Sequence, residues 1–250
     1  MKIIEYSRII FKFIRKLIFP PTCVFCGRIL EINSKINTCG QCGRYIKFCS
    51  DGVCCIKCGK PILGYNDKQL CYFCINNGAK RFDKIVSVFA YEDLVRNSII
   101  RFKAKGYRGY ADTFSDCMAA KFFEEYSHIK FDFLCGVPSN DKRNHKKDFD
   151  PVELLCNKLS KKIDLKYEKN IFKYLRKIQK QSALGYKERQ KNMIDSLEVF
   201  ENVDVSGKTI LLIDDICTTR ATITECSRAL KKAGAKHVFA LTLATVKNPD

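Results

Sequence analysis

Short apolar runs and amphipathic segments alternate along the chain from residue 84 to residue 245. Runs typical of strands occupy 84–91, 131–137, 209–213 and 237–245, with shorter extended pieces at 171–175 and 197–200. Helical periodicity covers 94–105, 111–126, 152–162 and 222–233. Strands separated by helices predict an α/β fold with a mainly parallel sheet and helices on both faces.

The N-terminal segment is apolar but interrupted by charges. Residues 3–19 carry Glu5, Arg8, Lys12, Arg15 and Lys16. The segment therefore contains no uncharged run long enough to span a membrane. The charged positions recur at helical spacing, which predicts a basic amphipathic helix over 1–20. We expect this helix to dock on its own protein, with a partner or a membrane surface as alternatives.

Between these regions the pattern C-x2-C-x12-C-x2-C occurs twice in tandem. Its members are Cys23, Cys26, Cys39 and Cys42, then Cys55, Cys58, Cys71 and Cys74. This spacing is typical of a zinc ribbon, in which two hairpin tips place four thiolates around one zinc ion. Because about 30 residues cannot build a hydrophobic core of their own, the metal must supply the stability of each repeat. The sequence predicts two structural zinc ions.

Two features of the cysteine pattern leave alternatives open. A secreted disulfide framework would also be rich in cysteine, but no cleavable signal precedes the repeats, so we expect a cytoplasmic protein with reduced thiols. Cys49 and Cys54 lie outside the quartets, and Cys54 is adjacent to Cys55 and able to replace it as a ligand. The ribbons can also pair 39/42 with 55/58.

Charge is concentrated at the N-terminal end. The net charge is +18, and residues 1–80 carry 13 basic against 4 acidic side chains, which gives +9. Such a field favours phosphate-bearing partners, namely nucleic acid, nucleotides or an anionic membrane surface. A lysine-rich, solvated surface is the plainer explanation. The Asn76–Gly78 turn predicts a junction, which divides the chain into 1–20, a ribbon unit at 21–78 and a larger domain at 79–250.

The most informative stretch of the larger domain follows the apolar run 209–213. Asp214 and Asp215 come at its carboxyl end, where open α/β sheets bind ligands. Residues 217–222 then lead into a helix N-terminus, which suits a phosphate. Carboxylates beside a phosphate site need another partner, and a ribose diol fits them, which indicates a phosphoribosyl group. Paired aspartates after a strand also occur in metal-dependent phosphotransfer and signalling domains.

The same stretch resembles the 5-phosphoribosyl-1-diphosphate (PRPP) motif of type I phosphoribosyltransferases. With tandem ribbons in front, the chain is similar to the ComF family of competence-associated proteins. Further family-like segments occur in order at 17–23, 89–92, 100–103, 137–138, 181–184 and 188–192. The resemblance covers nearly the whole chain.

This resemblance implies a magnesium-PRPP site. Asp214 and Asp215 would hold the ribose hydroxyls, and a mobile loop over 176–192 would close the site. The 5-phosphate would lie on the segment that comprises Cys217, Thr218, Thr219, Arg220, Ala221 and Thr222. The pyrophosphate side would span 138–151, with Pro138, Arg143 and Lys147 as candidate contacts.

The chain departs from the family pattern at two places. Arg220 stands where the family has glycine, so we expect either strain at a positive φ or a direct contact with phosphate. The pyrophosphate-side pattern becomes Lys147-Asp148-Phe149-Asp150-Pro151, and its acids disfavour pyrophosphate unless magnesium bridges them. The histidines are scattered, and Cys217 is either a helix-terminal thiolate or a small packing residue. These observations leave catalysis open.

The leading hypothesis is a ComF-like protein that binds magnesium-PRPP or a related phosphoribosyl compound. By resemblance its setting is the uptake of single-stranded DNA in natural transformation, with other competence proteins at the inner face of the membrane as partners. The alternative is a nucleic-acid or protein binding module with a vestigial PRPP site. Aromatic ribbon residues either stack bases or cover the zinc sites; they are Phe25, Tyr45, Phe48, Tyr65, Tyr72 and Phe73.

Overall fold

The computed structural model describes residues 20–34, 36–49, 54–60, 69–76, 81–139, 150–176 and 192–246, with single residues at 14, 17, 18, 62 and 188. Most of the expected helix over 1–20 and of the loop over 176–192 lies outside the described residues. Arg143, Lys147 and Tyr65 also lie outside them. Within the described part, no helix is long and apolar enough to cross a membrane.

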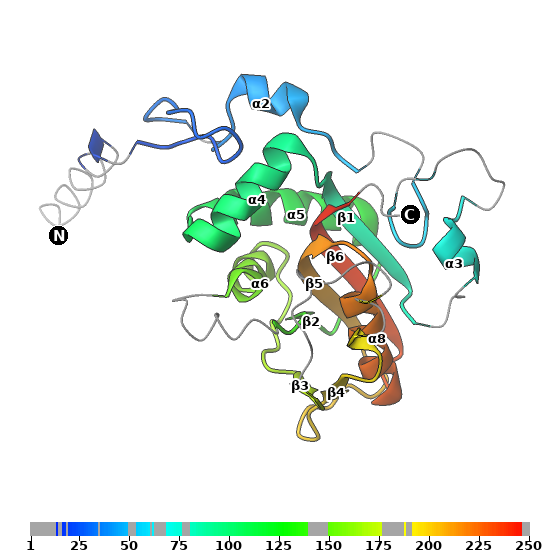
Figure 1. Ribbon diagram of the computed structural model, residues 1–250. Coiled ribbons are helices and arrows are strands. Elements are labelled where there is room, and N and C mark those ends of the chain that lie inside the picture. The colour runs from blue at the N-terminus through cyan, green and yellow to red at the C-terminus, as the bar shows by residue number, and fades with distance from the viewer. Residues whose placement is uncertain are drawn as a thin grey trace, which may run out of the picture.

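A parallel sheet of four strands lies at the centre of the larger domain, in the order β1-β6-β5-β2 (Figure 1). Its strands are β1 (Lys84–Ala90), β2 (Phe133–Gly136), β5 (Thr209–Cys217) and β6 (His237–Thr245). A separate antiparallel pair joins β3 (Phe172–Tyr174) to β4 (Leu197–Val199). The predicted parallel α/β architecture is confirmed.

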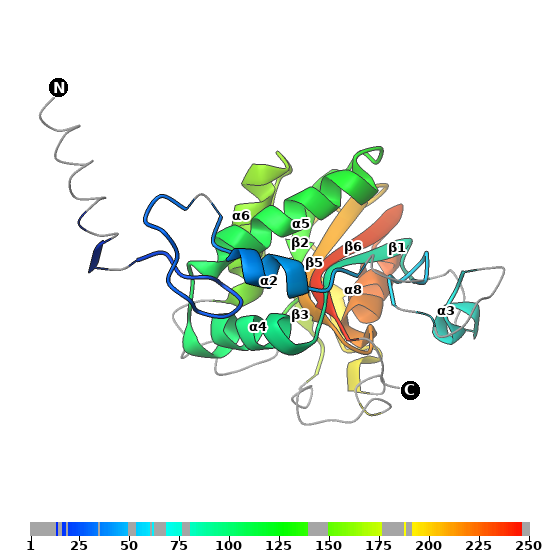
Figure 2. The same ribbon diagram turned by 90° about the horizontal axis from the view of Figure 1, so that it is seen from above.

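Helices cover both faces of this sheet, as the sequence predicts. They are α4 (Asp93–Lys105), α5 (Tyr110–Tyr126), α6 (Pro151–Lys162) and α8 (Ala221–Lys232). Helices α5 and α6 pack on each other and on one face, whereas α8 packs on β5 and β6 from the other (Figure 2). Because both faces are covered, β5 reads as a continuous apolar run, and Ile210 to Ile213 are fully buried.

Strand β5 is longer than the sequence pattern indicates. It continues past Ile213 to Cys217, because β6 is equally long and stays paired with it up to the register Cys217 with Thr245. Strand β2 ends earlier, since its last pair joins Gly136 to Ile213. The two aspartates therefore stand inside an extended strand, just beyond the point where β2 leaves the sheet.

The ribbon region covers the exposed edge of β1. It contains two short helices, α2 (Gly40–Tyr45) and α3 (Tyr72–Asn76), which lie on opposite sides of β1 (Figures 1 and 2). The amide of Cys49 donates to Val88 O at 3.0 Å, and the amide of Ala90 donates to Lys47 O at 3.0 Å. These bonds satisfy backbone groups that an open sheet edge would expose to other chains.

The first ribbon also enters the main hydrophobic core. Phe25 is only 2% exposed and meets Phe89 and Phe114 edge to face, with ring centroids 5.8 and 6.4 Å away. Arg101 of α4 donates from Nη2 to the carbonyl oxygen of Val24 at 3.1 Å and to that of Phe25. The ribbons and the sheet thus share one core.

Candidate functional site

The eight cysteines of the tandem repeat form two clusters, each made by one repeat. Within each quartet the sulfur atoms lie within 4.8 Å of one another. The Sγ–Sγ distance is 3.8 Å for Cys26 and Cys39 and 3.6 Å for Cys58 and Cys71. A tetrahedral site with Zn–S bonds of about 2.3 Å requires about 3.8 Å between sulfurs, so both clusters fit zinc. The alternative pairing of 39/42 with 55/58 is wrong.

The first knuckle of each ribbon has the same backbone geometry. Cys23 N donates to Arg28 O at 2.8 Å, and the equivalent bond from Cys55 N to Lys60 O measures 2.7 Å. The glycine after each knuckle has a positive φ, and a Cβ at Gly59 would lie 3.1 Å from a backbone oxygen of β1. The repeated Cys-x2-Cys-Gly sequence therefore encodes this turn.

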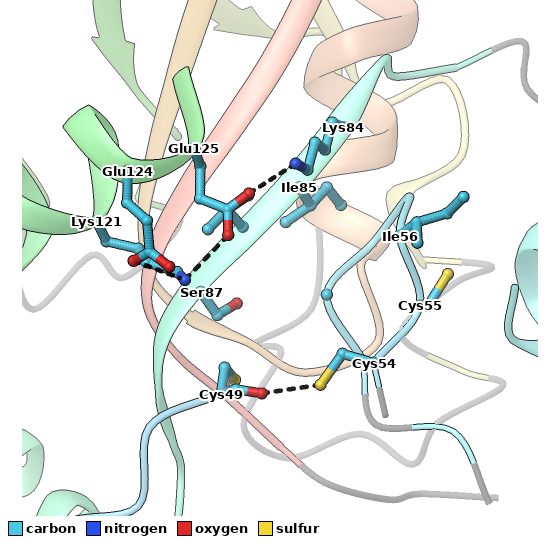
Figure 3. A pocket seen from close by; sticks show the side chains of 12 residues that line it. Cys49, Cys54, Cys55, Ile56, Lys84, Ile85, Ser87, Lys121, Glu124 and Glu125 are labelled. Atoms are coloured by element: carbon cyan, nitrogen blue, oxygen red, sulfur yellow. Dashed lines mark hydrogen bonds and ion pairs between the residues drawn. The ribbon is translucent and has the colours of Figure 1, made fainter. Parts of the chain in front are cut away.

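Cys49 and Cys54 belong to neither quartet among the described residues. The Cys54 thiol donates to the carbonyl oxygen of Cys49 at 2.8 Å instead of replacing Cys55. Both line a cavity of about 250 Å³ between the ribbon segment and α5 (Figure 3). At the α5 wall of this cavity Lys121 lies 3.0 Å from Glu125 of the same helix, and Glu125 also accepts from Lys84 at 2.7 Å. These charges neutralise one another, so the cavity has little to recognise a charged ligand.

Asp214 and Asp215 have different surroundings because successive side chains of a strand project to opposite faces. Asp215 is buried, and its Oδ2 lies 2.7 Å from Nζ of Lys103, which α4 brings across the end of β5. Asp214 accepts a hydrogen bond at Oδ1 from the amide of Asp215 at 2.8 Å. The side chain of Asp215 is therefore paired with a cation, whereas that of Asp214 accepts a hydrogen bond from the backbone of the next residue.

The electrostatics of the site follow from this arrangement. Burial, reinforced by the charge of Asp215, raises the pKa of Asp214 to about 8. Desolvation alone would lower the pKa of Lys103, but the carboxylates of Asp215 and Asp214 raise it above its usual value. At neutral pH the site thus holds a protonated Asp214 beside a lysine–aspartate ion pair. This arrangement carries less negative charge than two free carboxylates would.

The turn after β5 leads directly into α8. Thr219 is buried, and its Oγ1 accepts a hydrogen bond from the amide of Ala221 at 3.3 Å. Cys217 is also buried, which raises the pKa of its thiol to about 11, so it packs as a neutral side chain. The first turn of α8 has no acidic residue, and its N-terminal dipole is free to attract an anion.

Arg220 caps α8 with φ 64° and ψ 0°, in the left-handed region. Of the two alternatives that the sequence left open, the backbone has the positive φ, at which a non-glycine residue costs about 1 kcal/mol or more. Its side chain is 3% exposed. The guanidinium lies against the second ribbon, with Nη1 3.6 Å from Cys58 Sγ and Cζ 4.3 Å from the ring centroid of Phe73.

The segment predicted to be the pyrophosphate side begins where β2 ends. Tyr174 of β3 donates from its hydroxyl to Pro138 O at 2.9 Å. A cavity of about 540 Å³ opens here between residues 136–139 and 169–174. Asp150 accepts from the amides of Val152 and Glu153 at 2.8 and 3.1 Å, so this departure from the family pattern is an N-cap for α6. That carboxylate is thus turned toward backbone donors.

Sequence reasoning did not single out Lys103 as a site residue. It lies in the family-like segment 100–103. In a helical pattern, however, a lysine next to an apolar residue such as Phe102 looks like an ordinary surface residue. The contact of Phe73 with Arg220 was also missed, because it joins residues far apart in the chain. No local pattern marks either contact.

Comparisons with known proteins agree with this geometry. Residues 14–75 match the double zinc ribbon domain, and residues 153–249 match the phosphoribosyl transferase domain. The chain is 29% identical over 113 residues to Competence protein F of Haemophilus influenzae and 25% identical over 158 residues to Competence protein ComFC of Bacillus subtilis. These matches support the resemblance of the chain to the ComF family.

The similarity to these relatives covers only part of each chain. DNA utilization protein YhgH of Escherichia coli K12 is 25% identical over 107 residues. These three matches cover 44%, 63% and 43% of this chain and 49%, 62% and 46% of the relatives, so the chain spans about half the length of most of them.

Solved phosphoribosyltransferases are more distant. An adenine phosphoribosyltransferase is 15% identical at a TM-score of 0.37, covering 58% of this chain and 75% of that one. A hypoxanthine phosphoribosyltransferase from Staphylococcus aureus is 13% identical at a TM-score of 0.35, covering 55% of this chain and 64% of that one.

The two clusters generate a prediction about metal content. We expect two zinc ions per purified chain, and one after either Cys39→Ser or Cys71→Ser, because each variant removes one thiolate from one cluster. Elemental analysis of the purified proteins measures this. Less than about one zinc per folded wild-type chain would contradict the double-ribbon assignment.

Proposed function

We propose that this ComF-like protein binds magnesium-PRPP, or a related phosphoribosyl compound, where β5 passes into α8. One observation carries the proposal: Asp214 and Asp215 stand in the carboxyl-terminal part of the buried parallel strand β5, which ends at Cys217 before the turn that opens α8. Strand ends of this kind are where open α/β sheets bind ligands. The match of 153–249 to the phosphoribosyl transferase domain supports it.

The parts of the ligand find chemically suitable partners around this point. The amides at the N-terminus of α8 would receive the 5-phosphate. Asp215 would accept from a ribose hydroxyl, and Asp214, whose pKa is raised to about 8, can donate or accept at neutral pH. The cavity beside Pro138 would hold the diphosphate end with its magnesium, which neutralises the diphosphate charge.

Lys103 gives the site a cation that the ligand can share. In the absence of ligand it holds Asp215 at 2.7 Å. A bound phosphoribosyl group would compete with Asp215 for this ammonium, so Lys103 can compensate the negative charge of the ligand without new charge entering the site. Lys103 thus reduces the repulsion that two buried aspartates would otherwise exert on an anionic ligand.

A second proposal concerns DNA, and the names of the relatives support it. Two are competence proteins and one is a DNA utilization protein. In this chain Tyr45 of α2 and Tyr72 of α3 are 69% and 81% exposed, within a segment of charge +9. Exposed aromatic rings among basic side chains suit the stacking of single-stranded bases. We place this activity in the cytoplasm, beside other competence proteins.

The other described ribbon aromatics, three phenylalanines, make packing contacts. Phe25 is buried in the core, Phe48 packs on Phe89 at 5.3 Å, and Phe73 lies under Arg220. Tyr45 and Tyr72 are the most exposed ribbon aromatics among the described residues, so we assign base stacking to them first.

The first prediction here concerns Asp215→Asn. It should weaken magnesium-PRPP binding about tenfold or more, because a hydrogen bond to a charged acceptor contributes roughly 1.5 to 3 kcal/mol. Titration calorimetry measures the dissociation constant. Asp204→Asn is the matched control, since Asp204 is an exposed aspartate outside the site that pairs with Lys208 and accepts from the amide of Ser206. If both variants bind as tightly as the wild type, the ribose lies elsewhere.

The second prediction concerns single-stranded DNA. Binding of an oligothymidine should weaken steeply as salt rises, because basic side chains release counterions from phosphates. Replacing Tyr45 and Tyr72 together by Ala should reduce affinity by about thirtyfold or more, at roughly 1 kcal/mol or more per stacked base. Phe123→Ala, at an exposed aromatic of α5, should change nothing. Fluorescence anisotropy measures all three, and a salt-insensitive affinity would contradict the proposal.

A further inference from the structure

Arg220 joins two parts of the molecule that the sequence places far apart. Its backbone belongs to the turn between β5 and α8, where its carbonyl oxygen accepts from the amide of Thr224 at 2.8 Å. Its guanidinium lies at the second cysteine cluster, 162 positions away from Cys58 in the chain. Residues that must hold a positive φ are normally glycine, so the side chain at this position calls for an explanation.

The side chain bridges both halves of the second ribbon. Nη1 is 3.6 Å from the sulfur of Cys58, which ends the first knuckle, and the guanidinium stacks 4.3 Å from the ring of Phe73, which lies between the cysteines of the second. Arg101 has a comparable docking role at the first ribbon, but it donates to the carbonyl oxygens of Val24 and Phe25. At the second ribbon the contact reaches a metal ligand.

The chemistry of the cluster favours such a contact. Four thiolates around one Zn²⁺ carry a net charge of about −2, which a guanidinium can offset by donating to sulfur. Burial strengthens the attraction, and Arg220 is 3% exposed. Because Arg220 is fixed at both ends, the conformation of the turn depends on the presence of the cluster.

We propose that the second zinc cluster anchors the turn 218–221 through Arg220, which makes Arg220 a positioning residue. The importance of this anchor for a phosphoribosyl ligand rests on the proposed function, whereas the anchor itself does not. Loss of zinc from the second cluster releases the guanidinium and frees the turn. Loss of zinc from the first cluster leaves the turn unchanged.

Amide hydrogen exchange of the full-length chain tests this without any ligand. Cys71→Ser and Cys39→Ser are matched variants, because each removes the third cysteine of one quartet and both cysteines are half-buried. We expect Cys71→Ser to accelerate exchange in a peptide covering 217–226 by about tenfold, and Cys39→Ser to leave it unchanged. No acceleration in Cys71→Ser, or equal acceleration in both, would overturn the proposal.

A variant of the arginine supplies a second readout that does not remove a metal ligand. Arg220→Gly keeps a residue suited to positive φ but removes the guanidinium, so a chelator should extract one of the two zinc ions about tenfold faster. Combining it with Cys71→Ser should accelerate exchange no further than Cys71→Ser alone. Unchanged zinc release, or additive acceleration of exchange, would show that the contact does not anchor the turn. If the protein failed to bind PRPP, the proposed function would be overturned, but the anchor would still be tested by hydrogen exchange and by zinc release.

Discussion

The coordination of four thiolates in each ribbon is the constraint on which the rest of the structure depends. Ribbons of this size cannot build a core of their own, so they pack on the larger domain: Phe25 lies in its core and residues 47–49 lie on the edge of β1. The ribbons then replace the solvent or partner chain that an open β1 edge would otherwise meet. The molecule is therefore one hydrophobic unit in which the N-terminal third packs on the sheet of the C-terminal part.

The same constraint reaches the end of β5. A left-handed Arg220 is unfavourable by about 1 kcal/mol or more, and its contacts with Cys58 and Phe73 offset this cost. Meanwhile Lys103 balances Asp215, and burial keeps Asp214 protonated at neutral pH. The candidate site is thus held by groups from the ribbon, from α4 and from β5, and each of them reduces either the strain or the negative charge that an anionic ligand would meet.

Sequence reasoning predicted the features that depend on local pattern. Apolar runs located the strands, cysteine spacing defined both clusters, and Asp214-Asp215 marked the carboxyl-terminal part of β5, because these signals are set by neighbours along the chain. The extension of β5 to Cys217 was missed because it depends on pairing with β6. Likewise, the orientation of the Arg220 side chain and the ion pair of Lys103 arise from tertiary packing. The presence of arginine where the family has glycine left two alternatives open, namely strain at a positive φ and a contact with phosphate.

The central claim is that a phosphoribosyl site at the end of β5 depends on the second zinc cluster. Calorimetric titration of magnesium-PRPP into the zinc-loaded wild type, Cys71→Ser and Cys39→Ser tests it most directly. The account predicts one site per wild-type chain, affinity reduced about tenfold or more in Cys71→Ser, and affinity within about twofold of wild type in Cys39→Ser. Absence of binding to the wild type at millimolar ligand, or equal affinity in all three proteins, would contradict it.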